Sequence, residues 1–123
     1  LSSDFVKGFI CKKIIQFDLR LKKALKEMGV TNIFVNNRKK SINKATFGEL
    51  LSHNKFLKIG LFENIINQSD DSKHSDRGKL NKFRADLFHK LLGEDNSILE
   101  LDKIEILFEA DRKFSEWEKN NFQ

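Results

Sequence analysis

Hydrophobic residues in the first quarter of the chain repeat at the spacing of an amphipathic helix. They recur at alternating intervals of four and three between residues 3 and 28, at Ile10, Ile14, Phe17, Leu21, Ala24 and Met28. Such a repeat places one apolar stripe along a helix and leaves the polar side chains on its other faces. Ser3 or Asp4 is suited to cap the start, and Gly29 to end the helix. The pattern therefore predicts a long helix over 3–28.

The middle of the chain is less regular. Residues 31–45 contain a β-favouring run of only three residues, Ile33 to Val35, and we interpret this stretch as a connector. Thr46 and Glu49 have the spacing of a capping box, which predicts the start of a short helix. The apolar residues of 57–67 predict one further helix, in which Gly60 marks its entry or a close contact. Residues 68–76 contain no apolar side chain, so we expect a loop there.

Two more helices are expected in the last third of the chain. The first covers 78–92, with an apolar stripe formed by Leu80, Phe83, Leu87, Phe88 and Leu91. The second follows residues 93–97 and reaches about residue 120, with its buried side formed by Leu101, Ile104, Leu107, Phe108, Phe114 and Trp117. Four or five helices joined by short links, in a chain without proline, predict an all-α fold, an antiparallel helical bundle.

The length of 123 residues suits one domain, which we place at 1–123, as a whole protein or as a fragment of a longer one. No apolar run approaches the roughly 20 residues that span a membrane, and no secretory signal is visible. A single cysteine, Cys11, rules out an internal disulfide. A cytoplasmic location without membrane contact is therefore expected.

Charge is distributed unevenly along the sequence. The net charge is +5, but residues 94–123 carry −5 and residues 1–93 carry +10. The basic part is able to attract a polyanion such as RNA or DNA. The alternative is that the lysine-rich helices are simply solvated and that the acidic final helix neutralises them.

Arg84 lies inside the apolar stripe of the helix expected over 78–92. A guanidinium keeps its charge and is costly to bury without an anion or a hydrogen-bonding partner. His89 follows five residues later, roughly 140° further round the helix axis. In one regular helix the two side chains do not converge, so a shared site would need a bend or a second copy of the chain.

Residues 81–92 resemble the motif helix of HEPN domains. These small all-helical domains carry an arginine and a histidine separated by four to six residues on a late helix, and four residues separate Arg84 from His89. The sequences LNKFR, ending at Arg84, and FHKLLG, around His89, agree with the same family. The resemblance implies a HEPN-like bundle.

Many HEPN domains are metal-independent endoribonucleases of prokaryotic toxin–antitoxin, abortive-infection and CRISPR-associated defence systems, and the resemblance implies this activity here. Arg84 would hold the scissile phosphate, and His89 would transfer a proton, leaving a 2′,3′-cyclic phosphate. No metal and no cofactor is implied. HEPN domains commonly pair, so a homodimer is expected to complete the site, with an antitoxin or a larger defence complex as a further partner.

Several other residues are candidates for supporting roles. Asn81 and Asp86, one turn before Arg84 and His89, are candidate orienting groups. In a contact between two copies of the chain related by a two-fold axis, Arg84, Leu87 and Leu91 of one copy would lie against the same residues of the other. The candidates for contacts with the RNA backbone are Arg38, Lys39, Lys40 and Lys82.

The sequence departs from the family at two points, and other interpretations stay open. Ala85 replaces a residue that is often polar, and without tyrosine the modification that regulates one toxin branch is not expected. The alternative role for Arg84 is a structural ion pair with a carboxylate of the acidic final helix, such as Glu105 or Asp111. The alternative function is that of a catalytically inactive HEPN-like RNA-binding or dimerisation module of a larger defence protein. A DNA-binding helix-turn-helix regulator is the weaker hypothesis, because an acidic segment follows the helix.

Overall fold

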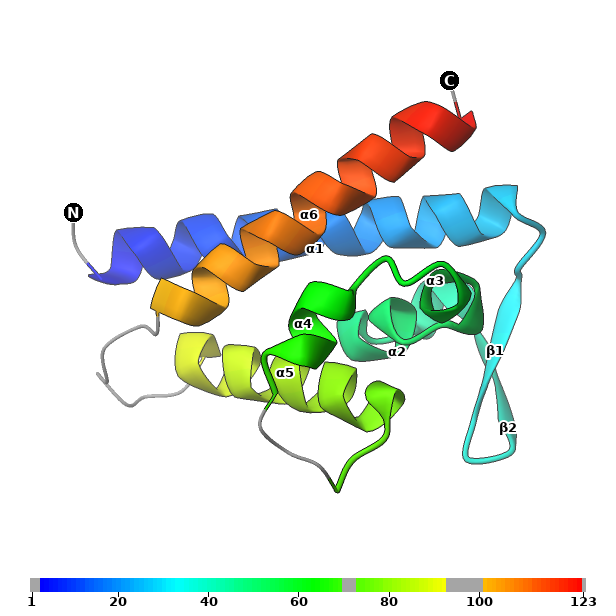
Figure 1. Cartoon of the computed structure of the whole chain (residues 1–123), viewed down its shortest axis with the longest axis horizontal. Coiled ribbons are helices and arrows are strands. Elements are labelled where there is room, and N and C mark those ends of the chain that lie inside the picture. Colours follow the sequence, from blue (N-terminus) through cyan, green and yellow to red (C-terminus); the bar gives the residue numbers. More distant parts are fainter. Residues whose placement is uncertain (1–2, 70–72, 93–100, 123) are drawn as a thin grey trace.

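The computed structural model describes residues 3–69, 73–92 and 101–122, and within them the chain is mostly helical (Figure 1). The helices are α1 (Ser3–Glu27), α2 (Phe47–Leu51), α3 (Asn54–Lys58), α4 (Glu63–Asn67), α5 (Asp76–Leu92) and α6 (Leu101–Phe122). Strands β1 (Asn32–Val35) and β2 (Arg38–Ser41) form a hairpin, followed by a 3-10 turn, η1 (Ile42–Lys44). The expected all-α class is confirmed in this broad sense, with a small sheet in addition.

The two longest helices, α1 and α6, pack side by side and run in the same direction. Phe9 lies in the first half of α1 and Phe108 in the first half of α6, and their ring centroids are 6.4 Å apart. Further along, Arg20 Nη2 lies 2.6 Å from Glu118 Oε1. Helix α5 runs the opposite way (Figure 1). The expectation of an antiparallel bundle is therefore wrong for the pair α1 and α6.

The expected first helix is confirmed. Its apolar seam lies in the core, where Ile10, Ile14, Phe17, Leu21 and Ala24 are all buried. The helix ends at Glu27, and Gly29 follows with a φ of 86°, a left-handed conformation that glycine adopts without strain. The side chain of Ser3, one of the two candidate caps, lies outside the described residues.

The interpretation of residues 31–45 as a plain connector is wrong, because they form the hairpin of β1 and β2. The turn residues Asn36 and Asn37 have φ values of 52° and 65°. Two consecutive positive φ angles are what a type I′ hairpin turn requires, and asparagine tolerates them better than most residues. The strands are only four residues long and β2 is entirely polar, so neither carries an alternating pattern that would have predicted it.

The capping box at the start of α2 is confirmed. The Glu49 N–H donates to Thr46 Oγ1 at 3.2 Å, and the Thr46 N–H donates to Glu49 Oε1 at 2.8 Å. The single helix expected over 57–67 is wrong, because α3 ends at Lys58 and α4 begins at Glu63. Gly60 lies between them with a φ of 63°, which ends the first helix and turns the chain into the second.

The last two helices are confirmed, with differences in detail. Helix α5 starts at Asp76, two residues earlier than expected, and Leu80, Phe83 and Leu87 of its stripe are buried. Phe108 was expected on the buried side of α6 but is exposed. The link over 93–97 and the side chains of Leu91 and Leu101 lie outside the described residues.

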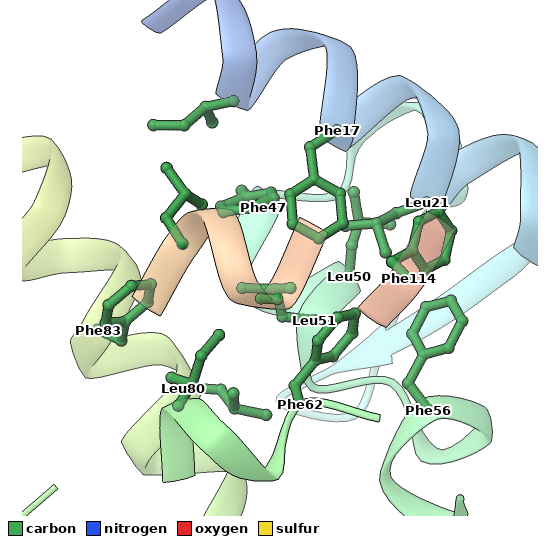
Figure 2. Packing of buried hydrophobic residues seen from close by; sticks show 14 of the residues in the cluster. Phe17, Leu21, Phe47, Leu50, Leu51, Phe56, Phe62, Leu80, Phe83 and Phe114 are labelled. Atoms are coloured by element: carbon green, nitrogen blue, oxygen red, sulfur yellow. The ribbon is translucent and has the colours of Figure 1, made fainter. Parts of the chain in front are cut away.

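A cluster of aromatic rings joins α1, the short helices and α6 (Figure 2). The centroid of the Phe114 ring is 5.5 Å from that of Phe17 and 5.9 Å from that of Phe56. Phe62, which precedes α4, lies 5.7 Å from Phe56 and 6.1 Å from Phe17. Buried aromatic pairs of this kind add to the stabilisation that comes from removing apolar surface from water.

A buried carboxylate links α6 to α1 beside this cluster. Asp111 is only 5% exposed. Its Oδ2 lies 2.8 Å from Lys13 Nζ, and its Oδ1 accepts a hydrogen bond from Arg20 Nη1. The Arg20 guanidinium also bonds Ser115 and Glu118 and lies 5.2 Å from the centre of the Phe114 ring. Because both cations come from α1, this network fixes the register of the two helices.

We predict that Asp111→Asn lowers the free energy of unfolding by about 1–3 kcal/mol, because the neutral amide leaves two cations of α1 without their shared anion. Urea unfolding followed by Trp117 fluorescence measures the change. Glu116→Gln is the matched control: Glu116 pairs with Arg112 on the exposed side of the same helix, so its loss should leave the midpoint nearly unchanged. Equal effects of the two substitutions would contradict the assignment.

Candidate nucleic-acid interface

Arg84 is half-buried on α5 and lacks an anionic partner among the described residues. Its Nε atom is buried with no hydrogen-bond partner within this part of the chain. Its Cζ lies 4.5 Å from the centre of the Phe88 ring, four residues further along the helix. The structural ion pair considered from the sequence is not formed: Asp111 pairs with Lys13 and Arg20, and Glu105 is exposed.

Gly48 explains how Arg84 is positioned. Helices α2 and α5 approach so closely that a Cβ at Gly48 would lie 3.3 Å from Arg84 Cβ and 2.5 Å from Asn81 Oδ1. A side chain at this position would displace both residues. Because Gly48 has no side chain, α2 can pack closely against the face of α5 that carries Arg84 and Asn81.

His89 is exposed and lies on the same continuous helix as Arg84. Five residues of regular helix separate the two side chains by roughly 140°, as expected from the sequence. One copy of the chain therefore does not bring the guanidinium and the imidazole to one point.

The two candidate orienting groups, Asn81 and Asp86, have other partners. Asn81 Nδ2 donates to the carbonyl oxygen of Arg77 at 3.0 Å. Asp86 Oδ2 lies 3.2 Å from Lys103 Nζ on α6 and 3.6 Å from Lys82 Nζ. Asp86 therefore helps to join α5 to α6, and Lys82, a candidate RNA contact, partly neutralises it.

Leu87, expected at a contact between two copies, is instead buried in the core of its own chain. Leu91, expected beside it, has its side chain outside the described residues. Among the described residues, the large hydrophobic side chains that are exposed lie elsewhere than on α5, at Phe5, Phe9, Ile15, Leu19, Phe34, Ile59 and Phe108. The described surface of α5 is thus mainly polar.

The basic candidates on the hairpin divide into two groups. Arg38 and Lys39 are exposed on β2, whereas Lys40 Nζ lies 2.8 Å from Glu49 Oε1 and attaches the hairpin to α2. Lys39 is paired across the strands with Phe34, whose ring is exposed. Arg38 and Lys39 therefore remain available to a polyanion, and Lys40 is engaged in a structural ion pair.

Arg77 is a candidate that the sequence analysis missed. Because α5 starts at Asp76, Arg77 belongs to the helix and lies four residues before Asn81 and seven before Arg84. These intervals place the three residues on one stripe of the helix surface. A helix wheel that starts at residue 78 omits Arg77, which is why the stripe was overlooked.

His53 is a second residue that the sequence analysis missed. It is the N-cap of α3, where its Nδ1 accepts a hydrogen bond from the Lys55 N–H at 3.1 Å. Burial lowers the pKa of His53 below its usual range, and the positive charges of Lys55 and Arg77 lower it further. Protonation of the imidazole is therefore disfavoured beside Arg77, at the start of α5.

Two general findings apply to the part of the chain that the structure describes. It contains no group of three or more His, Cys, Asp and Glu residues placed to hold a metal ion. None of its helices is both long enough and apolar enough to cross a membrane.

Compared with protein-family models, with curated proteins and with solved structures, the chain matches none of them.

We predict that His53 makes the protein less stable as the pH falls. The unfolded histidine titrates near pH 6.5, and the pKa in the folded protein is lower, so protonation favours the unfolded chain. The contribution of neutral His53 to the free energy of unfolding is fully present above about pH 6.5. It is lost as the pH falls through the lower pKa of the folded protein. Protonation of Nδ1 also removes the acceptor that caps α3.

The comparison with His53→Asn isolates this effect, because asparagine is a good N-cap and does not titrate. The difference in free energy of unfolding, wild type minus variant, should decrease between pH 7.5 and pH 5 in urea titrations. A difference that stays constant or increases as the pH falls would contradict the prediction.

Proposed function

We propose that the protein is a HEPN-like endoribonuclease of a prokaryotic defence or toxin system. It cleaves RNA without a metal. The reaction site combines Arg84 of one copy with His89 of a second copy. The resemblance of residues 81–92 to the HEPN motif helix suggests the activity, and the surroundings of Arg84 provide the physical support.

The observation that carries the proposal is the buried Nε of Arg84, which has no hydrogen-bond partner within the part of the chain that the structure describes. Arg20, the arginine that links α1 to α6, has two carboxylates and a hydroxyl as partners. Arg84 lies over the Phe88 ring, and its buried Nε has no hydrogen-bond partner among the described residues. A phosphate would supply the missing anion, and a guanidinium binds phosphate through two parallel hydrogen bonds.

The chemistry that this site supports is transesterification by the RNA itself. The ribose 2′-oxygen attacks the adjacent phosphorus, and the bond from phosphorus to the 5′-oxygen breaks. His89 of the second copy accepts the 2′-hydroxyl proton or donates a proton to the departing 5′-oxygen, and water takes the other of these two roles. Arg84 stabilises the charge that develops on the phosphoryl oxygens. The products carry a 2′,3′-cyclic phosphate and a 5′-hydroxyl.

A second candidate is a domain that binds RNA without cleaving it. The engagement of Asp86 by Lys82 and Lys103, together with the burial of Leu87, favours this alternative. These contacts remove one orienting group from His89 and one apolar residue from the expected contact between copies. Ala85, beside Arg84, supplies no polar replacement.

We predict that the protein cleaves an end-labelled, mixed-sequence RNA in EDTA and that His89→Ala slows cleavage by about 100-fold or more. Arg84→Ala should reduce both cleavage and binding, with Arg84→Lys intermediate, because lysine keeps the charge but loses the two-pronged geometry. His74→Ala is the matched control, since it removes another exposed histidine that precedes α5. Gel analysis of the products identifies the cyclic phosphate.

Mixing the variants tests the composite site. A pair formed from one Arg84→Ala copy and one His89→Ala copy retains one complete site, so an equal mixture should recover about a quarter of the wild-type rate. Binding without cleavage by the wild type would favour the second candidate. Cleavage that persists in His89→Ala, or the absence of both binding and cleavage, would reject the proposed reaction site.

A further inference from the structure

A polar groove of about 410 Å³ lies between the hairpin and the start of α5. Strand β1 forms one wall, with Phe34 among its lining residues, and the start of α5 forms another, with Arg77 and Asn81. His53 and Asn54, at the start of α3, also line it. This volume lies within the range of sites that hold small molecules and single nucleotides.

Phe34 gives this groove an exposed aromatic surface. It is 70% exposed, the highest value among the exposed large hydrophobic residues that the structure describes. Its neighbour in the strand, Ile33, is buried, so the alternation of β1 directs the Phe34 ring outward. Lys39 is its cross-strand partner and lies on the same face of the hairpin. An aromatic ring beside a cation is the combination that binds the bases and backbone of unpaired nucleic acid.

Arg77 supplies a positive charge on the opposite wall. It is exposed, and its Nη2 donates a hydrogen bond to Asn54 Oδ1, which orients the guanidinium. An arginine has five N–H donors, so this bond leaves others for a phosphate. Arg84 lies two helical turns further along the same stripe, about 10 Å away along the helix axis.

Amide side chains provide hydrogen bonds within the groove. Asn81 is oriented by its bond to the Arg77 carbonyl oxygen, and Asn54 by its bond from the Arg77 guanidinium. Amides can both donate to and accept from the edges of bases. The groove therefore offers a stacking surface, a cation and amide groups within one space.

We propose that this groove binds one unpaired nucleotide of an RNA strand, with its base stacked on Phe34 and its phosphate at Arg77. The strand then continues along α5 to Arg84. This inference rests on the proposed function for the identity of the polyanion, and it adds a binding subsite separate from the reacting phosphate. It also makes the protein selective for single-stranded RNA, because a paired base cannot stack on Phe34.

The experiment measures binding of a fluorescein-labelled, mixed-sequence single-stranded RNA by anisotropy over a series of salt concentrations. All variants are made in a His89→Ala background so that the RNA stays intact. Phe34→Ala should weaken binding about tenfold without changing the slope of log affinity against log salt. Arg77→Gln should weaken binding and make that slope less steep by the amount that corresponds to about one phosphate contact.

Conservative variants separate stacking from simple hydrophobic contact. Phe34→Trp should retain or improve binding, whereas Phe34→Leu should behave like Phe34→Ala, because leucine keeps the apolar bulk but loses the aromatic face. Phe5→Ala is the matched control for the loss of an exposed phenylalanine, since Phe5 lies near the start of α1 and outside the groove lining. With the same RNA annealed to its complement, Phe34→Ala should have no effect.

The outcomes distinguish the two proposals. RNA binding that depends on Arg84 but is unchanged by Phe34→Ala and Arg77→Gln would overturn the proposal that the groove binds a nucleotide. It would leave the proposed function intact. Equal losses for Phe34→Ala on single-stranded and duplex RNA would also overturn it. Failure of the His89→Ala protein, and of the wild type under the same conditions, to bind any RNA would reject both proposals.

Discussion

The packing of phenylalanine rings is the interaction on which the rest of this structure depends. Helices α2, α3 and α4 each have five residues, far fewer than an isolated helix needs to be stable in water. Phe47, Phe56 and Phe62 attach these segments to Phe17 of α1 and Phe114 of α6. Because the short helices hold both the hairpin and α5, the aromatic core determines where the candidate interface lies.

The two half-buried arginines show how the same residue type serves different purposes. Arg20 is surrounded by Asp111, Ser115 and Glu118, so its charge is balanced within the chain and holds α1 to α6. Arg84 lies on a phenylalanine ring, and its buried Nε has no partner within the described residues. A buried donor without a partner costs free energy, and a bound anion would remove that cost. Arg84 is therefore the better candidate for function. The sequence around each arginine does not by itself distinguish the structural role of Arg20 from the candidate role of Arg84.

The sequence predicted the features that depend on local chemistry. The apolar repeat of α1, the capping box at Thr46 and the end of α1 at Gly29 follow from spacing and residue type, and all three are confirmed. The hairpin could not be predicted from alternation, because its strands are short and β2 is polar. The missed start of α5 at Asp76 had the larger consequence, since it concealed Arg77. The partners of Asp86 and Asp111 depend on how helices pack, which no spacing within one helix reveals.

A chain of contacts joins the hairpin to the arginine stripe of α5. Lys40 of β2 pairs with Glu49, and Glu49 completes the capping box of α2. In the same short helix, Gly48 allows Asn81 and Arg84 to approach closely. These contacts connect the hairpin, α2 and α5, and they restrain Phe34 on the hairpin relative to Arg84 on α5. An RNA strand that contacts both would thus meet a preorganised surface, and little ordering of the protein would oppose binding.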